Sequence, residues 1–170
     1  MNSQGTYFAI LGTAESSMTA YDLHLNQFID NGEKKWCVDG QTGHMICSNQ
    51  TLVVATSLGT IARWNLQLGE MFPTESKQLS ILRVDGPVTA LVMDDLNNEG
   101  LAGTAYGALY YVNFNEKVKI RVVNKAYSVQ RAVTTVKFCE SNPELILTNC
   151  CNDGANGSGA VKVWASKTLD

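Results

Sequence analysis

The chain has 170 residues, of which 45% are hydrophobic and 17% charged, with a net charge of −3 and a pI near 5.4. A chain of this length can bury one sizeable core. The weak negative charge offers no basic field to a nucleic-acid backbone, and no run of about 18 apolar residues is present. We therefore expect partners other than nucleic acid or membrane.

Short strand-like runs, separated by Gly, Asn and Asp, follow one another from the first residues onward. The first segment predicts three strands within residues 7–38 and lacks an innermost strand. It consists of Tyr7–Thr13, Met18–His24 and Lys34–Val38. The second segment, residues 44–84, predicts four strands: His44–Cys47, Leu52–Ser57, Thr60–Leu66 and Gln78–Val84.

The third and fourth segments repeat this arrangement. Residues 88–123 predict four strands: Val88–Met93, Gly100–Ala105, Ala108–Phe114 and Val118–Val123. Residues 133–170 predict three strands and lack an outer one: Val133–Cys139, Leu145–Asn149 and Ala160–Ala165. No helical periodicity competes with these runs, so the predicted fold class is all-β, built from antiparallel sheets.

A sequence block recurs with the segments. It reads Gly12–Ser16, then Ala55–Gly59, then Gly103–Gly107, and a degraded copy ends at Gly159; the block ends are 43, 48 and 52 residues apart. A second short repeat, Val-Asp-Gly, occurs at Val38-Asp39-Gly40 and again at Val84-Asp85-Gly86. A repeat of this size made of short strands indicates a β-propeller. Propellers have about four to eight blades, so we expect roughly three and a half blades of a larger propeller, forming one domain over residues 1–170.

Several short stretches of the sequence resemble the repeat pattern of a known family. Gly43-His44 followed by Trp64-Asn65 resembles the GH…WD pattern of WD40 repeats, as does Asp153-Gly154 followed by Val161–Trp164. The stretch Gly100–Asn113 is similar to a repeat in the centriolar and ciliary WD-repeat proteins of the "proteome of centriole sixteen" family. In that family a microtubule-associating domain precedes a long series of such repeats.

This resemblance covers residues 50–170, whereas residues 1–45 are only generically similar to WD repeats. It implies a scaffold of the centriole or ciliary microtubule wall, with tubulin or microtubule-associated proteins as partners. Further blades of the same longer chain would be partners too. The implied location is the cytoplasm and cytoskeleton, at the cilium or centriole. The alternative is a WD40 adaptor of another soluble complex, such as a ubiquitin-ligase substrate receptor or a trafficking scaffold.

The chain departs from the common WD40 pattern at its polar positions. In that pattern an Asp in the turn after the second strand joins a His, a Ser or Thr, and the Trp in a buried hydrogen-bonded group. The Asp position holds Glu15, Leu58 and Tyr106, and only the fourth copy offers Asp153. Only His44 is placed for the histidine role. We therefore expect the blades to depend on apolar packing.

No arrangement for catalysis, cofactor or metal binding is predicted. Hydrolytic catalysis needs a nucleophile with a base in reach, and the two histidines, His24 and His44, lie in no such motif. Adjacent Cys150 and Cys151 point to opposite faces of a strand and cannot form a Cys-x₂₋₄-Cys zinc chelate. The first residues have neither the basic start nor the apolar stretch of a secretory signal, and the total of five cysteines is odd, so we expect reduced thiols in the cytoplasm.

Two groups of residues are candidates for protein binding. Lys117, Lys119 and Arg121 share one face of the outermost strand of the third blade. In a purely structural interpretation, these charges protect the edge strand against pairing with another strand. In a functional interpretation, they form a basic ridge that binds an acidic partner such as tubulin.

The second group consists of aromatic residues. Tyr106, Tyr110 and Tyr127 are expected to be exposed and able to anchor a protein, because tyrosine is enriched at interfaces. Tyr106 lies in a predicted turn, where packing does not easily account for a large ring. It is therefore the preferred contact residue.

Overall fold

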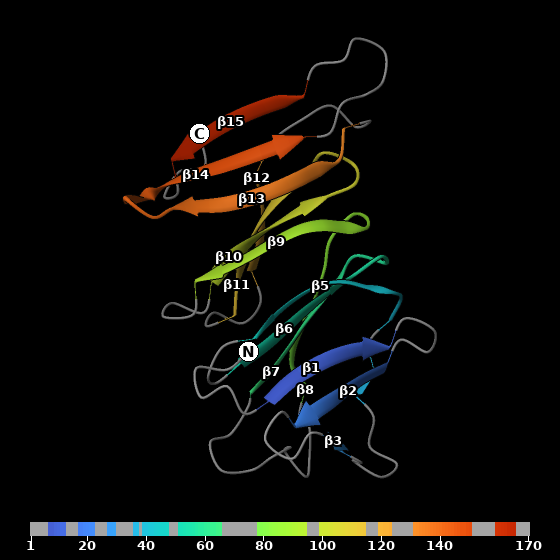
Figure 1. The fold of residues 1–170 in the computed structure, drawn as a ribbon. Helices are drawn as coiled ribbons and strands as arrows, with labels where there is room; N and C mark the ends of the chain where they lie inside the picture. Colours follow the sequence, from blue (N-terminus) through green and yellow to red (C-terminus); the bar gives the residue numbers. More distant parts are fainter. Residues whose placement is uncertain are drawn as a thin grey trace. The chain divides into compact units, whose positions relative to one another are not determined.

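The computed structural model describes eleven stretches of the chain. They are residues 7–12, 17–22, 27–29, 36–37, 39–47, 51–65, 78–94, 99–114, 119–123, 131–150 and 159–165. These stretches contain fifteen β-strands and no helix. The predicted all-β fold class is confirmed (Figure 1). The chain divides into two compact units, Met1–Leu82 and Arg83–Asp170.

The first unit contains the first two sheets. In the first sheet β1 pairs with β2, and β2 pairs with both β3 and β4, so the outer strand is divided in two. These strands are β1 (Tyr7–Gly12), β2 (Ser17–Asp22), β3 (Gln27–Ile29) and β4 (Trp36–Cys37). The second sheet has the order β5-β6-β7-β8, with β5 (Thr42–Cys47), β6 (Thr51–Thr56), β7 (Thr60–Asn65) and β8 (Gln78–Arg83).

The second unit holds the third and fourth sheets. The third sheet has the order β12-β11-β10-β9, with β9 (Val88–Asp94), β10 (Glu99–Thr104), β11 (Leu109–Asn113) and β12 (Lys119–Val123). The fourth has the order β13-β14-β15, with β13 (Val133–Cys139), β14 (Asn142–Cys150) and β15 (Ala160–Ala165). Every predicted strand has a counterpart whose ends differ by at most three residues, and β3 is an addition that the sequence did not indicate.

The sheets also repeat an irregularity that sequence reasoning did not predict. The register of β9 on β10 shifts just after Val88, and that of β13 on β14 shifts just after Val133. The register of β5 on β6 shifts just after Thr42, at the same point of the repeat. A bulge inserts one extra residue and increases the local twist. Three sheets therefore share one strand geometry, which allows residues to be compared position by position.

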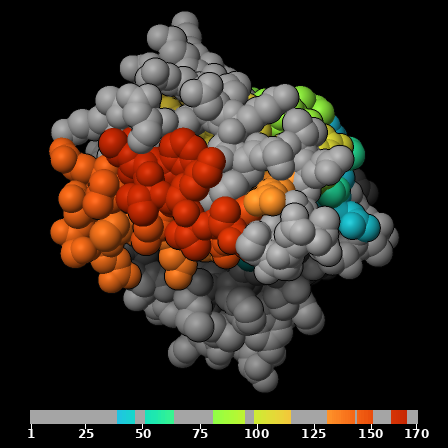
Figure 2. Space-filling view, turned by 90° about the horizontal axis from the view of Figure 1, so that it is seen from above, coloured from blue at the N-terminus to red at the C-terminus, as the bar shows by residue number. Residues whose placement is uncertain are grey.

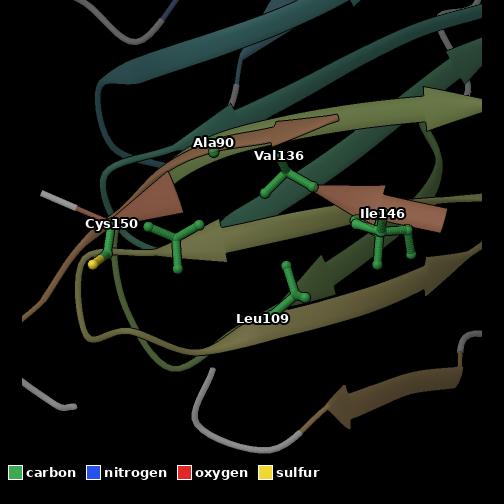
Figure 3. Close-up of a cluster of buried hydrophobic side chains, with 7 residues drawn as sticks. Ala90, Leu109, Val136, Ile146 and Cys150 are labelled. Atoms are coloured by element: carbon green, nitrogen blue, oxygen red, sulfur yellow. The ribbon is translucent and has the colours of Figure 1, made fainter. Parts of the chain in front are cut away.

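The third and fourth sheets pack face to face within their unit. Ala90, Leu101 and Leu109 of the third sheet form one buried cluster with residues of the fourth (Figure 3). The fourth-sheet members are Val133, Val136, Ile146 and Cys150. The cluster joins strands far apart in the sequence and provides the core of this unit.

Two features let these sheets approach closely. A Cβ at Gly103 would lie 2.5 Å from Cγ1 of Val133, so the glycine leaves the space that the valine occupies. The hydroxyl of Thr89 donates to the carbonyl oxygen of Val133 at 2.7 Å and contacts that of Gly103 at 3.3 Å. A side-chain hydrogen bond thus joins the first strands of the two sheets.

Candidate protein-interaction surface

The turn between β10 and β11 is fixed by its own residues. Gly107 has a φ of 79°, a conformation that glycine adopts without steric cost, and its N–H donates to the Thr104 carbonyl at 3.2 Å. The fully buried Thr104 hydroxyl oxygen accepts from the N–H groups of Tyr106 and Ala108, both at 3.3 Å. One buried threonine therefore satisfies two turn donors.

The turn between β6 and β7 has the same design. Gly59 has a φ of 78°, and its N–H donates to the Thr56 carbonyl at 3.2 Å. The buried Thr56 Oγ1 accepts from Leu58 N at 3.3 Å and from Thr60 N at 3.2 Å. The recurrent sequence block is thus a hydrogen-bonded turn in both sheets.

Each turn is tied to the loop that precedes the first strand of its sheet. Ala105 N–H donates to the Pro87 carbonyl at 2.8 Å, and Ser57 N–H donates to the Gln41 carbonyl at 2.7 Å. Gln41 N–H donates in return to Ser57 Oγ at 3.0 Å. The antiparallel order brings this loop and turn to the same end of the sheet.

The tips of these turns carry exposed apolar side chains. Tyr106 is 48% exposed and Leu58 is 60% exposed. Each lies against a glycine, since a Cβ at Gly86 would lie 2.4 Å from Cε2 of Tyr106 and one at Gly40 would lie 2.7 Å from Cγ of Leu58. The glycine of each Val-Asp-Gly sequence, Gly40 or Gly86, therefore leaves the space that the tip side chain occupies, and we call it the glycine seat. The predicted exposure of Tyr106 is confirmed, and its position has a packing explanation that the sequence did not reveal.

The expected exposure of Tyr110 is wrong. Its ring is buried, and its hydroxyl oxygen accepts from Asp85 N–H at 3.3 Å. Burial raises the pKa of Tyr110, and a hydrogen bond with the Asp85 side chain raises it further. Tyr110 lies on β11, a strand with neighbours on both sides, and its hydroxyl anchors the loop before β9.

The basic ridge stays a prediction. Lys119 and Arg121 lie on β12, the outermost strand of the third sheet, opposite Asn113 and Tyr111. This backbone register places both residues on one face of the strand, as expected. Lys117 and Tyr127 lie outside the described residues.

Part of the polar hydrogen-bonded group of the WD40 repeat is present in the described part of the fourth sheet. Trp164 Nε1–H donates to Thr148 Oγ1 at 2.8 Å in the fourth sheet, and Thr148 is buried. Sequence reasoning missed this pair because it looked for the Asp and His of the group. A Thr on the neighbouring strand, close to the Trp in register, was the available signal.

The described stretches contain no group of three His, Cys, Asp or Glu residues that could hold a metal ion. His44 is half-buried on β5 opposite Ala55. Cys150 is buried, and Cys151 lies outside the described residues. Among the residues that can be described, no helix is long and apolar enough to cross a membrane.

This chain is similar to known proteins in sequence and in fold. No protein-family model matches it. Human WD repeat-containing protein 90 is 26% identical over 165 residues, which are 94% of this chain and 9% of the relative. A chain of the mitotic checkpoint complex matches with a TM-score of 0.74 and 13% identity, over 98% of this chain and 46% of that one.

A second solved structure agrees with the first. Chaetomium thermophilum Sqt1 bound to the N-terminus of ribosomal protein L10 matches with a TM-score of 0.72 and 16% identity, over 96% of this chain and 44% of that one. The fold is a segment of a WD40-type β-propeller. This segment spans less than half the length of either solved propeller, and about a tenth of the curated relative.

Proposed function

We propose that this propeller segment is a non-catalytic scaffold that presents the ends of its sheets to other proteins. The observation that carries the proposal is the repeated turn with an exposed apolar tip, Leu58 in one sheet and Tyr106 in the other. Both tips are held by a buried threonine and a glycine seat. A rigid, half-exposed tyrosine loses little conformational freedom on binding, which favours it as an interface anchor.

The comparisons support a protein as the ligand. Sqt1, a structural neighbour, was solved with the N-terminus of a ribosomal protein bound to it. The curated relative is a WD-repeat protein, the class that the sequence resembles.

Within this class, we place the chain at the wall of the centriole or ciliary microtubule, in contact with tubulin or neighbouring structural proteins. The support is the resemblance of Gly100–Asn113 to the centriolar family, together with the human WD-repeat relative. Lys117, Lys119 and Arg121 are the candidate contacts for an acidic surface. The adaptor role in another soluble complex is the competing function, and the location of the protein in a ciliated cell discriminates the two.

The test is co-sedimentation with microtubules. Lys117→Glu, Lys119→Glu and Arg121→Glu in one variant should abolish most of the co-sedimenting protein while the thermal melting curve stays native. The control variant, Lys117→Arg with Lys119→Arg, keeps the charge and should bind as the parent does. Full co-sedimentation of a natively folded triple-Glu variant would remove the ridge from the proposal.

A further inference from the structure

The loop before β9 carries an acidic side chain next to the glycine seat of Tyr106. Asp85 is exposed and directly precedes Gly86 in the sequence. The ring atoms Cε2 and Cδ2 of Tyr106 would lie 2.4 and 2.5 Å from a Cβ at Gly86. Part of residues 81–94 (light green), the stretch that contains this loop, reaches the surface in Figure 2. One loop therefore offers a carboxylate and supports an exposed aromatic ring.

The third sheet holds both groups in place. The N–H of Tyr106 donates to the hydroxyl oxygen of the buried Thr104 at 3.3 Å. The N–H of Asp85 donates to the hydroxyl oxygen of Tyr110 at 3.3 Å, and the same hydroxyl is hydrogen-bonded to the Asp85 side chain. An ionised carboxylate can accept about four hydrogen bonds, so Asp85 keeps acceptor sites for a ligand. Because the ring and the carboxylate are fixed in advance, binding orders little that is not already ordered.

A ring and a carboxylate on one loop favour a cation as the ligand. The face of an aromatic ring attracts a cation, and a carboxylate accepts charge-assisted hydrogen bonds from it. Arginine can make both contacts at once, because its planar guanidinium group stacks on rings and donates in pairs to carboxylates. The net charge of −3 on the chain favours the approach of a basic partner.

The second sheet has the same loop and turn without this combination. Its tip is the aliphatic Leu58, which has no ring to attract a cation. Ala62 stands where the third sheet has Tyr110, since each residue follows its turn glycine by three positions. No tyrosine hydroxyl therefore reaches Asp39 from this position. Of these two equivalent turns, only that of the third sheet joins an exposed ring to an anchored carboxylate.

We propose that Tyr106 and Asp85 form a binding site for an arginine side chain of a partner protein. The guanidinium group lies over the exposed side of the Tyr106 ring and donates to the Asp85 carboxylate. This inference rests on the proposed function, because it names the chemistry of the partner that one of the exposed tips contacts.

The experiment is an NMR titration of the isotope-labelled 170-residue chain with the peptide acetyl-Gly-Arg-Gly-amide. The amide signals of Gly86, Tyr106 and Gly107 should shift and saturate in the millimolar range of peptide concentration. A peptide with citrulline in place of arginine has nearly the same shape and no charge. It should bind at least about fivefold more weakly at the same amides.

Two variants test the two groups separately. Tyr106→Leu gives the third sheet the tip of the second, and Asp85→Asn removes the charge but keeps an acceptor for the Tyr110 hydroxyl. Each should raise the Kd of the arginine peptide about five- to tenfold and leave the melting curve native. Tyr106→Phe keeps the ring and should change the Kd by less than about twofold. Val161→Ala, which truncates an exposed side chain of the fourth sheet, is the control and should leave the Kd unchanged.

Three results would overturn the proposal. Equal affinity for the arginine and citrulline peptides would show that the site does not recognise charge. An unchanged Kd for natively melting Tyr106→Leu and Asp85→Asn variants would place the arginine elsewhere on the chain. Tighter binding of acetyl-Gly-Leu-Gly-amide at the same amides would replace arginine by an apolar ligand and keep Tyr106 as a protein contact. Microtubule co-sedimentation does not enter this test, so the inference and the proposed function can fail separately.

Discussion

The second and third sheets share the residues that fix the turn, called the frame here, and differ in the side chain at the tip of that turn. Both have the early bulge, the buried threonine in the turn and the glycine under the tip. The tip is Leu58 in one and Tyr106 in the other. The frame residues hold the backbone, and the tip residue is open to variation, which is the arrangement expected of a binding surface on a repeated scaffold.

Among changes to the turns, the largest expected effect comes from removing the hydroxyl of the buried threonine. Thr104→Val keeps the shape of the side chain but leaves the N–H groups of Tyr106 and Ala108 without their acceptor. We expect a loss of about 2–3 kcal/mol in the free energy of unfolding, measured by urea denaturation. Thr56→Val should cost a similar amount, and Thr104→Ser, which keeps the acceptor, should cost much less. Equal losses for Val and Ser would show that the hydroxyl is irrelevant.

A second change makes the third sheet resemble the second. Ala55 takes in the second sheet the place of Gly103, and Gly103→Ala would press a methyl group against Val133. Overpacking of this kind costs about 1–3 kcal/mol, and we expect about 2. The double variant Gly103→Ala with Val133→Ala should recover part of the loss by the same assay. A simple sum of the two single effects would contradict close contact at this point.

Substitution by alanine should have different effects on stability at the two glycine seats, Gly40 and Gly86. Gly40 has a φ of 81°, which alanine adopts only with strain, whereas Gly86 does not have a φ in this range, so Gly40→Ala should lose about 1–2 kcal/mol of stability. Gly86→Ala should mainly displace the Tyr106 ring and weaken partner binding, with a smaller effect on melting. Thermal melting and a binding assay on the same two variants make the comparison, and identical melting losses would argue against it.

The smallest effect has the opposite sign. Thr42 and Thr60 have buried hydroxyl oxygens with no hydrogen-bond partner among the described residues, while the third sheet has the buried Val88 and Ala108 at these places. Thr42→Val combined with Thr60→Ala should therefore raise the free energy of unfolding by about 1 kcal/mol, because unsatisfied buried polar groups are costly. A loss in urea denaturation would mean that these hydroxyls have partners in solution.

The sequence predicts the strands well because many of them are short runs that follow or precede Gly, Asn or Asp. The glycine seats and the Trp164–Thr148 hydrogen bond escaped prediction, since both depend on distances between strands. Tyr110 shows the main weakness of sequence reasoning: alternation along β11 does not reveal that both of its faces are covered. Tyr106 was identified because its turn could be located from the repeat, whereas its contact with Gly86 could not.

The central claim is that successive sheets cover one another face to face, and one pair of equivalent residues tests it directly. Leu109 is buried under the fourth sheet, and Val161 is its exposed equivalent. In the 170-residue chain, Leu109→Ala should lower the free energy of unfolding by about 3 kcal/mol, and Val161→Ala should change it by less than about 0.5 kcal/mol. Similar losses at both positions would contradict the stacking of sheets.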